Sequence, residues 1–374
     1  MRLCFLANPN STHTRRWVDW FRRQGHATLV IANHPPELPW PEVELAALQS
    51  GQTASWLKYP EWLAQTRRAI QGWQPDILHA HQVASAGWLG AFSGFHPFVV
   101  TPWGSDLYEQ PRQSRLAAWL AGYVLRRADW VTADSQDLLE LAARFGASRN
   151  RASLVQWGVD LDIFHPASAV CPGCQQLQRA LDLHGQQVVL SPRGMQPIYN
   201  LERIIATIPA VLQAKPGAVY LLRDYIATPG YRARLEEQAA RLGVSHAIRW
   251  LGVIEPWEET VHCYHLADVA VSIPASDATP VSLLEAMACG VPVIAGDLPS
   301  LREWITPGEN GVLVDPEDVE GLTQAILSVL HDPGLRGKFY ARNRRLLQEK
   351  ADHQAEMKKM DALYRKLVSE SGPA

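Results

Sequence analysis

One stretch organises the interpretation of this chain: Ser276-Asp277-Ala278-Thr279-Pro280-Val281-Ser282-Leu283-Leu284-Glu285-Ala286-Met287-Ala288-Cys289-Gly290. The apolar run 269–273 before it is typical of a buried strand, and the run 291–295 after it predicts the next strand. Between them, Thr279 can cap a helix, Pro280 suits its first position and Gly290 its end. A strand–helix–strand unit of this kind indicates a parallel sheet.

The start of this helix is a candidate binding site for a phosphate group. The first N–H groups of a helix have no partner within it, and the positive end of the helix dipole lies there. Asp277 stands just before the helix and Glu285 stands within it, and both carboxylates can accept hydrogen bonds from sugar or ribose hydroxyls. A capping Asp and a peripheral Glu on an ordinary βαβ unit would show the same spacing, so both interpretations stay open.

Length and composition limit the class of protein. A chain of 374 residues allows two domains, and a net charge of −3 argues against a general polyanion binder, so we expect no nucleic-acid partner. No apolar run approaches the length of a membrane span, and residues 1–7 are typical of a first strand and too short for a secretory signal. The five cysteines, an odd number in mostly apolar settings, favour reduced thiols and a cytoplasmic location.

The motif Cys171-Pro172-Gly173-Cys174 lies in a stretch rich in proline and glycine. From the sequence we assign no second Cys/His pair at zinc spacing to this motif. We therefore expect no metal site. A local disulfide or a pair of free thiols is the expected state.

The first half of the chain alternates predicted strands and helices, which indicates a parallel sheet. A strand is predicted over 3–7, a helix over 15–23 and a second strand over 27–32. The loop 8–14 carries hydroxyls and a histidine but no glycine. It could bind a polar ligand, but the dinucleotide-binding fingerprint is absent.

Two histidines end a later strand of this half, predicted over 76–81. Alternation places His79 and His81 on one face, with His81 nearer the carboxyl edge, where open α/β sheets bind ligands. We expect His79 to be a satisfied core histidine and His81 to belong to a site. The next strand, 98–101, runs into the turn Trp103-Gly104-Ser105-Asp106, which offers a hydroxyl and a carboxylate.

The second half starts the alternation again with a strand over 187–190. Arg193 stands just beyond this strand, as a bidentate phosphate ligand or as a member of a surface ion pair. A later strand ends in exposed backbone at 252–254, which could read a nucleobase edge. We predict an α/β protein with two Rossmann-like, doubly wound parallel-sheet domains that face a cleft.

With these residues in place, the chain resembles the GT-B glycosyltransferases of family GT4, the bacterial exopolysaccharide and lipid-glycan type. The resemblance covers almost the whole length and rests on motifs that are specific only in combination. They are Thr12-His13-Thr14-Arg15-Arg16-Trp17 with Gly25-His26, His79-Ala80-His81, Trp103-Gly104-Ser105-Asp106, Gly158-Val159-Asp160 with Phe164 and Pro166, Arg193, Gly252, the stretch 277–290 with Pro292-Val293-Ile294, and Asn310-Gly311-Val312-Leu313-Val314.

The resemblance implies transfer of a hexose-type sugar, with retention at the anomeric carbon, from a nucleotide-diphosphate donor. The donor is a UDP-sugar by family frequency, and the acceptor is a hydroxyl of a glycan, a lipid or a small molecule. No metal and no other cofactor is implied, because a helix N-terminus and cationic side chains neutralise the diphosphate. The domain boundaries that we expect are 1–166 for the acceptor side, 167–186 for a linker, 187–350 for the donor side, and 351–374 for a helix that crosses back to the first domain.

The resemblance also assigns roles to residues. It places Glu285 on the ribose, Arg193 on the diphosphate and His81 beside the donor sugar near the reacting carbon. The remaining donor-binding residues are Ile254, Asp277, Ala278, Thr279 and Pro280. The acceptor-side residues are His13, Thr14, Trp103, Ser105 and Asp106. The predicted catalytic group is His81, Asp277 and Arg193.

The chain departs from the family pattern in several places. Asp277 replaces the first of two glutamates, and Pro197-Ile198-Tyr199-Asn200 occupies the place of the family lysine that follows Arg193. Arg223-Asp224-Tyr225 replaces a glycine-containing loop, and Trp103 stands where many relatives have histidine. One phosphate-neutralising charge is missing unless Arg223 or another cation replaces it.

These departures motivate a second hypothesis, a degenerate GT-B protein that binds a nucleotide sugar or a glycan without turnover. A GT-B isomerase or phosphorylase is a third, although no lysine stands out as a pyridoxal anchor. A separate hypothesis concerns the inner face of the membrane: the arginines of helix 15–23 could dock on anionic lipid around its aromatic residues. The alternative is a solvated basic helix whose aromatic face packs into the domain.

Overall fold

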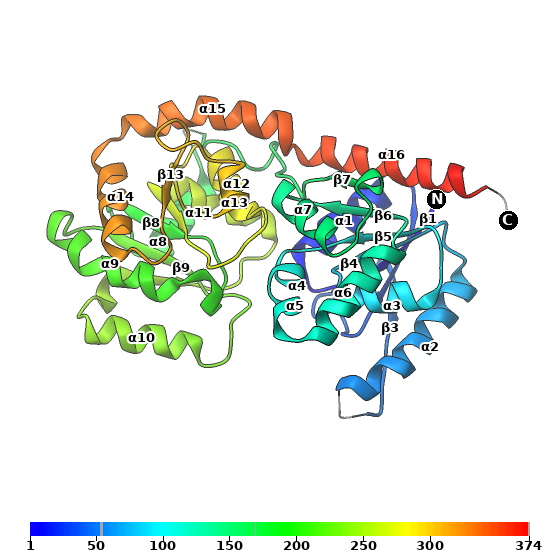
Figure 1. The fold of residues 1–374 in the computed structure, drawn as a ribbon. Coiled ribbons are helices and arrows are strands. Elements are labelled where there is room, and N and C mark those ends of the chain that lie inside the picture. The colour runs from blue at the N-terminus through cyan, green and yellow to red at the C-terminus, as the bar shows by residue number, and fades with distance from the viewer. Residues whose placement is uncertain (53–54, 169, 373–374) are drawn as a thin grey trace. The chain divides into compact units, whose positions relative to one another are not determined.

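The computed structural model describes residues 1–52, 55–168 and 170–372, and it divides the chain into two compact units (Figure 1). Unit 1 consists of Met1–Trp157 and Gln354–Ala374, and unit 2 consists of Gly158–His353. Residue 169 of the predicted linker and residues 373–374 of the predicted C-terminal segment lie outside the described residues.

Unit 1 is built on a parallel sheet that has seven strands among the described residues, in the order β3-β2-β1-β4-β5-β6-β7. The strands are β1 (Arg2–Leu6), β2 (Ala27–Ala32), β3 (Glu44–Ala47), β4 (Ile77–His81), β5 (Phe98–Thr101), β6 (Trp130–Ala133) and β7 (Ala152–Leu154). The strand order changes direction between β1 and β4. Open α/β sheets bind ligands at such a switch point, beyond the carboxyl ends of the two strands.

The helices of unit 1 are α1 (Thr12–Arg23), α2 (Ser55–Trp73), α3 (Ala86–Ser93), α4 (Ser105–Tyr108), α5 (Gln110–Gln113), α6 (Arg115–Arg127), α7 (Gln136–Arg144) and α16 (His353–Ser371). Helix α1 begins at Thr12, three residues before the predicted start at Arg15, with Ser11 as its N-cap. Helix α16 comes from the far end of the sequence but packs on the same core. Its Tyr364 is fully buried, with the hydroxyl 2.6 Å from Nδ1 of His79 and 3.4 Å from Nε1 of Trp17.

Unit 2 repeats this plan with a six-stranded parallel sheet in the order β10-β9-β8-β11-β12-β13. The strands are β8 (Val188–Ser191), β9 (Val219–Arg223), β10 (Ile248–Leu251), β11 (Val269–Ser272), β12 (Val293–Gly296) and β13 (Val312–Val314). The central strands are continuous apolar runs because both faces of a parallel sheet are covered. Here the switch point lies between β8 and β11.

The helices of unit 2 pack in two groups. Helices α9 (Leu201–Ala214), α10 (Tyr231–Arg241) and α14 (Val319–His331) form one group. Helices α8 (Pro172–Ala180), α11 (Val261–Leu266), α12 (Val281–Ala288) and α15 (Gly334–Lys350) form the other. The short helix α13 (Pro299–Arg302) follows β12.

The predicted fold class is confirmed, since each unit is a doubly wound parallel sheet. Several details differ from the sequence-based expectation. The predicted linker contains a helix, α8, which Cys171 caps and Pro172 begins. Strand β3 and helix α3 were not predicted. Within the described residues, no helix has both the length and the apolar character that crossing a bilayer requires.

Candidate active site

Two charged residues flank the switch point of unit 2. Arg193 follows the carboxyl end of β8, and Asp277 follows the carboxyl end of β11. Because β8 and β11 are neighbours, their side chains meet: Nη2 of Arg193 lies 2.9 Å from Oδ2 of Asp277. The sequence left Arg193 open between a ligand-binding role and a surface ion pair, and the structure places it in a largely buried ion pair at the sheet edge.

The Arg193 guanidinium also reaches the helix after β11. Its Nη1 donates to the hydroxyl of Ser282, in the first turn of α12, at 3.3 Å. Its central carbon lies 4.1 Å from the ring centre of Tyr199, an arrangement typical of a cation–π contact. Burial by itself would lower the pKa of Arg193, but Asp277 and the nearby tyrosines raise it above its ordinary value. A permanently cationic group therefore lies at a helix N-terminus, where an anion is favoured.

Tyr225 connects this arginine with a second one. The guanidinium of Arg223, at the end of β9, lies 4.8 Å from the ring centre of Tyr225 and is largely buried. Burial raises the pKa of Tyr225, while the charges of Arg193 and Arg223 oppose this shift. Tyr225 thus stays a neutral hydroxyl between two cations.

Glu285 is held by a tyrosine from the neighbouring helix. The hydroxyl of Tyr264, on α11, donates to Oε2 of Glu285, on α12, at 2.7 Å. Burial and the Glu285 carboxylate raise the pKa of Tyr264 well above its ordinary value, so that its proton stays on the hydroxyl. One oxygen of the half-buried Glu285 carboxylate is thereby oriented.

The segment between Asp277 and α12 differs in detail from the expectation. Pro280 is the N-cap and Val281 the first helical residue, so α12 begins one position later than predicted. Thr279 is therefore not the N-cap residue, and its hydroxyl accepts a hydrogen bond from Nε1 of Trp304 at 3.3 Å. The backbone carbonyl of Asp277 accepts from the Ser300 hydroxyl at 2.8 Å. Ala278, Thr279 and Pro280 are all buried, so this loop offers backbone rather than side chains.

Unit 1 has a corresponding group at its own switch point, where β1 leads into His13 and β4 ends at His81. The ring centre of His81 lies 5.4 Å from that of Trp157 and 6.0 Å from that of Trp103, and His13 lies within 6.0 Å of both tryptophans. Trp157 was not predicted. It completes an aromatic cluster around the two histidines.

The two histidines of β4 differ in their hydrogen bonding, and His79 is the satisfied core histidine that the sequence predicted. Both ring nitrogens of His79 are satisfied, Nδ1 by Tyr364 and Nε2 by the Thr101 hydroxyl at 2.7 Å. Neither ring nitrogen of His81 has a hydrogen-bond partner among the described residues, although the side chain is 2% exposed. Burial, with a smaller effect of His13, lowers the pKa of His81 to about 3. Its imidazole is therefore neutral and keeps one donor and one acceptor for a ligand.

The backbone beyond His81 is strained. Gln82 has φ of 104° and Ser85 has φ of 46°, which non-glycine residues adopt rarely. Asp106 holds this loop, because its carboxylate accepts from the backbone N–H of Val83 at 2.6 Å and of Trp103 at 2.9 Å. Strain of this kind is concentrated at functional sites and persists only where the surroundings enforce it.

The other predicted acceptor-side residues lie on the elements around this loop. Asp106 is buried and its carboxylate is used by backbone donors, so it positions the loop. Thr14 is fully buried in the first turn of α1. Ser105 is exposed at the start of α4. Ile254, a predicted donor-binding residue, lies in unit 2, in the loop after the edge strand β10, and is half-exposed.

Two family models match the chain over separate segments. "Glycosyl transferases group 1" matches residues 176–346, and "Glycosyl transferase 4-like" matches residues 2–135. The chain belongs to the group 1, GT4-type glycosyltransferases.

Known relatives of this group 1 chain differ in what they act on. Glycogen synthase of Mycobacterium tuberculosis is 26% identical over 283 residues, which are 70% of this chain and 62% of that protein. D-inositol 3-phosphate glycosyltransferase of Streptosporangium roseum is 27% identical over 334 residues, which are 83% of this chain and 73% of that protein. The chain thus spans less than two thirds of the glycogen synthase that it matches.

A solved structure confirms the GT-B architecture. Anabaena HepE in complex with UDP-glucose matches with a TM-score of 0.83 at 18% identity, and the match covers 98% of this chain and 100% of that one. At an identity this low, the match shows the fold of this group 1 chain and does not show its substrate.

The structure shows what fills the place of the family lysine in this group 1 chain. Asn200 is buried, and its side-chain amide donates to the carbonyl of Ile273 at 2.8 Å. Tyr199 lies against Arg193. These residues hold the loop after β8 against the loop after β11, and they add no charge. Arg223 supplies the second buried cation of this region.

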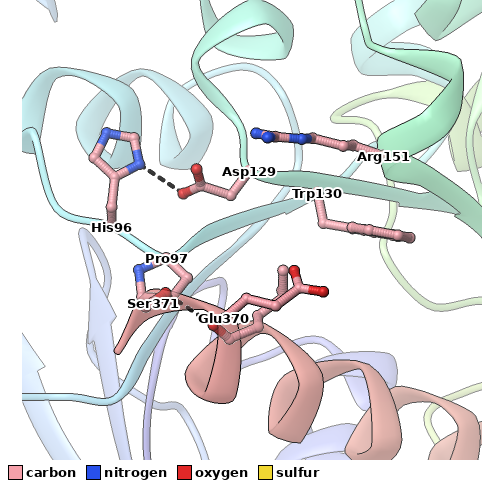
Figure 2. Close-up of a pocket in the computed structure, with 8 residues that line it drawn as sticks. His96, Pro97, Asp129, Trp130, Arg151, Glu370 and Ser371 are labelled. Atoms are coloured by element: carbon pink, nitrogen blue, oxygen red, sulfur yellow. Dashed lines mark hydrogen bonds and ion pairs between the residues drawn. The ribbon is translucent and has the colours of Figure 1, made fainter. Parts of the chain in front are cut away.

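A pocket of about 170 Å³ in unit 1 lies apart from these residues (Figure 2). Its lining includes Pro97, Asp129 and Arg151, which precede β5, β6 and β7. It therefore opens at the amino edge of the sheet, opposite the edge where such folds bind ligands. Its volume is also below the roughly 300–1,000 Å³ of small-molecule sites. We assign it no role in the reaction.

The aromatic face of α1 is internal. Trp17, Trp20 and Phe21 are buried in unit 1, and Nε1 of Trp20 donates to Oε1 of Gln354 at 2.7 Å. Arg15 donates to backbone carbonyls, including that of Pro9 at 2.8 Å. The aromatic anchors of the membrane hypothesis are therefore engaged in the core.

Proposed function

We propose that this protein is a retaining, metal-independent glycosyltransferase that moves a hexose-type sugar from a nucleotide-diphosphate donor, a UDP-sugar, to a hydroxyl group. One observation carries this proposal: the buried Arg193 guanidinium lies at the switch point of unit 2 against the first turn of α12. When the sugar is transferred, the nucleoside diphosphate of the donor is the leaving group, and negative charge grows on it. A preorganised cation and a helix N-terminus stabilise this charge.

The neighbouring residues suggest how the donor would be oriented. Tyr264 fixes one oxygen of Glu285, which suits a carboxylate that accepts hydrogen bonds from the two ribose hydroxyls. Arg223 supplies a second buried positive charge near Tyr225. With these charges and the helix N-terminus, the leaving diphosphate needs no divalent ion. Added Mg²⁺ or Mn²⁺ should therefore leave the rate unchanged.

Donor binding must change the Arg193–Asp277 pair. A diphosphate would compete with the Asp277 carboxylate for the same guanidinium, which makes one ion-pair contact with Asp277 and can bind phosphate oxygens through two N–H groups. Asp277 would then be free to accept hydrogen bonds from the donor sugar. We propose this exchange as the first step of donor binding. We also propose that it occurs because Asp277 has a shorter side chain than the glutamate of the family pattern.

His81 is the proposed contribution of unit 1. Its neutral imidazole has no partner among the described residues, so a sugar hydroxyl could donate to one nitrogen and accept from the other. The acceptor is proposed as a hydroxyl of a glycan, a lipid or a small molecule. The relatives support this range, since their names include both a glycogen synthase and an inositol 3-phosphate glycosyltransferase.

The test is donor binding followed by turnover. A thermal-shift panel of nucleotide diphosphates and their sugars should show a raised melting temperature with UDP and UDP-sugars. Arg193→Lys keeps the positive charge but loses the planar guanidinium that can bind a phosphate through two N–H groups. It should lower kcat/KM for donor hydrolysis or transfer about 100-fold. Arg241→Lys, at an exposed position, is the matched control. The proposal is wrong if the protein binds no common donor, or if kcat/KM of Arg193→Lys equals that of the wild type.

A second candidate is a protein that binds nucleotide sugar without turnover. The observation that favours it is the same ion pair, because Asp277 occupies Arg193 and the family lysine is replaced by Asn200. Asp277→Ala separates the two candidates. In an enzyme the variant loses turnover; in a binding protein it binds donor at least as tightly, and neither the variant nor the wild type transfers sugar.

We also propose that the protein acts in the cytoplasm. Cys4, Cys263 and Cys289 are buried free thiols, which suits a reducing compartment. A peripheral contact with the inner membrane face would depend on the basic side chains of α1 alone, since its aromatic residues are buried. Co-sedimentation with anionic vesicles that is unchanged in Arg22→Glu/Arg23→Glu would exclude this contact.

A further inference from the structure

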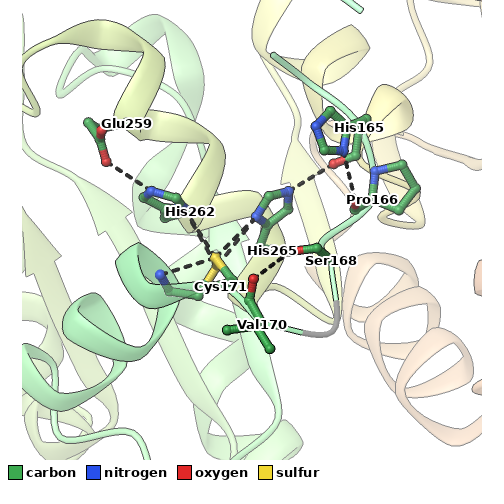
Figure 3. Close-up of a disulfide and its surroundings, with 9 residues drawn as sticks. His165, Pro166, Ser168, Val170, Cys171, Glu259, His262 and His265 are labelled. Atoms are coloured by element: carbon green, nitrogen blue, oxygen red, sulfur yellow. Dashed lines mark hydrogen bonds and ion pairs between the residues drawn. A yellow bond between two sulfur atoms is a disulfide. The ribbon is translucent and has the colours of Figure 1, made fainter. Parts of the chain in front are cut away.

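Four side chains of metal-ligand type meet in unit 2. Cys171 and Cys174 lie at the start of α8, and His262 and His265 lie on α11 (Figure 3). One ligand atom from each residue lies within 4.8 Å of the others. The sequence analysis treated the cysteine pair alone and missed the H-x-x-H pair, which lies 88 residues beyond Cys174. Only the packing of α8 against α11 brings the two pairs together.

The sulfur–nitrogen distances fit a tetrahedral ion, whereas the two sulfurs are bonded to each other as a disulfide and would have to separate on reduction. Nδ1 of His262 lies 3.5 Å from Sγ of Cys171 and 3.5 Å from Sγ of Cys174. Nδ1 of His265 lies 3.8 Å and 3.4 Å from the same two sulfurs. Zinc bonds of about 2.3 Å to sulfur and about 2.0–2.1 Å to nitrogen, at tetrahedral angles, put a sulfur and a nitrogen about 3.5 Å apart.

The outer partners of both histidines direct Nδ1 toward the sulfurs. Nε2 of His262 lies 2.9 Å from Oε2 of Glu259, and Nε2 of His265 lies 2.8 Å from the carbonyl oxygen of His165 (Figure 3). Each Nε2 therefore carries the proton, which leaves the lone pair on Nδ1 for a metal. Metal-bound histidines in proteins show this arrangement almost always.

The cysteine loop is shaped for the same purpose. The backbone N–H of Cys174 donates to Sγ of Cys171 at 3.2 Å, a bond that would stabilise a thiolate. Gly173 allows the loop to approach α11, because a Cβ at this position would lie 2.1 Å from Nε2 of His262. Cys174 is buried and the other three side chains are partly buried, so the site is shielded but reachable.

We propose that the reduced protein binds one zinc ion through Cys171, Cys174, His262 and His265, as a structural site. Two sulfurs and two imidazoles in a closed tetrahedron are a typical zinc set. In the structure the two sulfurs form a disulfide. A dithiol reductant would give up two electrons and two protons to this disulfide and itself become a disulfide. Zinc would then bind both sulfurs as thiolates and release the two protons.

The site would stabilise an element that the proposed function uses. Zinc would join α8 to α11, and α11 carries Tyr264 between the two histidines. Tyr264 is the donor to Glu285. Metal binding and disulfide formation exclude one another, and the disulfide links only Cys171 with Cys174, so the redox state would decide whether zinc joins α8 to α11. The zinc site itself does not depend on the proposed function.

Metal content is the direct test. The protein is reduced with a phosphine, equilibrated with Zn²⁺ and freed of excess metal. Its zinc content is then measured by elemental mass spectrometry. We expect stoichiometric zinc, a higher melting temperature with zinc, and tetrahedral d–d and thiolate charge-transfer bands with Co²⁺. Cys171→Ser/Cys174→Ser should abolish all three. His246→Ala and Cys4→Ala, outside the cluster, should keep them.

A second variant keeps the test valid if the cysteine variant does not fold. Glu259→Gln changes a half-exposed outer partner and should weaken zinc binding about tenfold or more without unfolding the protein. Oxidation of the loaded protein should release the metal and restore the disulfide. If the reduced wild type binds no stoichiometric zinc, or if the cysteine variant binds it equally well, the proposal is wrong.

Discussion

At the scale of single residues, the proposed donor site depends on one hydrogen bond between helices. Tyr264→Phe removes the hydroxyl that donates to Glu285 at 2.7 Å and keeps the ring. A hydrogen bond to a charged group contributes about 1.5–3 kcal/mol, so we expect the donor KM to rise about tenfold or more while kcat changes little. Steady-state kinetics with the best UDP-sugar measures this.

Tyr220→Phe provides the matched control. Its hydroxyl lies 3.0 Å from that of Thr207 in the core of unit 2. It should lower stability and leave the donor KM unchanged. Equal effects of the two variants on KM would show that Tyr264 acts only through stability.

The buried histidines of β4 predict a pH dependence of stability. Burial lowers the pKa of His81 to about 3 and that of His79 well below its ordinary value. The unfolded chain binds these protons near pH 6.5 and the folded chain does not, so this stability is complete above about pH 6.5 and is lost as the pH falls toward 3. The loss should approach about 1.4 kcal/mol per pH unit for each histidine.

Denaturant titrations of wild type and His81→Gln between pH 7 and pH 4.5 test this. The free energy of unfolding of the variant should fall less steeply as the pH falls. His246→Gln, at an exposed position, should follow the wild-type slope. Parallel slopes for all three proteins would contradict the expectation.

At the scale of elements, one glycine connects the two ends of unit 2. Gly158 has φ of +70°, and a Cβ there would lie 2.7 Å from Cα of His353 and 3.0 Å from the carbonyl oxygen of Ala351. The next residue, Val159, is hydrogen-bonded to both Ala351 and His353. Gly158→Ala should cost about 2–4 kcal/mol, because it combines backbone strain with a clash against backbone.

Calorimetry measures this change as a lower melting temperature of unit 2. Gly217→Ala is the control, since a Cβ there meets no atom within 4 Å. If Gly158→Ala melts at the wild-type temperature, the backbone at residues 351–353 is less constrained than the structure indicates.

The sequence predicted elements that carry strong local signals. The buried strands β4, β8 and β11 and the capped helix α1 were all expected. Helix α8 was not, because Pro172-Gly173 suggests a linker and its only buried residue is Cys174. Strand β3 was also missed, since it is a short edge strand with no buried residue.

The candidate site shows the same division. Arg193 and Asp277 were singled out because each stands beyond a strand end, and Glu285 because it stands within the helix that follows; their roles were predicted from the family resemblance. Tyr225 and Tyr264 were not, because their roles depend on which strand lies beside β8 and which helix lies beside α12. A sequence does not show such neighbours until the fold is assembled.

At the scale of the whole molecule, unit 1 is built from two distant parts of the chain. Met357, Met360 and Tyr364 of α16 are fully buried in it. Each such side chain contributes about 1.5–3 kcal/mol by burial, which together is a large share of the stability of a domain. Removal of residues 354–374 should therefore abolish the calorimetric transition of unit 1 and keep that of unit 2.

Arg365→Ala is the control for this truncation. It lies on the same helix, and its exposed side chain makes only an ion pair with Asp361, which is worth little. It should keep both transitions. A truncated protein with an intact first transition would show that α16 is dispensable for unit 1.

The discontinuity of unit 1 also has a consequence for biosynthesis. Residues 1–157 leave the ribosome first, but the helix that covers their core follows about 200 residues later. At about 5–20 residues per second, this delay lasts roughly 10–40 s. During that time Trp17 and His79 lack the tyrosine that satisfies them, so the nascent first unit is a natural client for a chaperone, while the continuous second unit can mature alone.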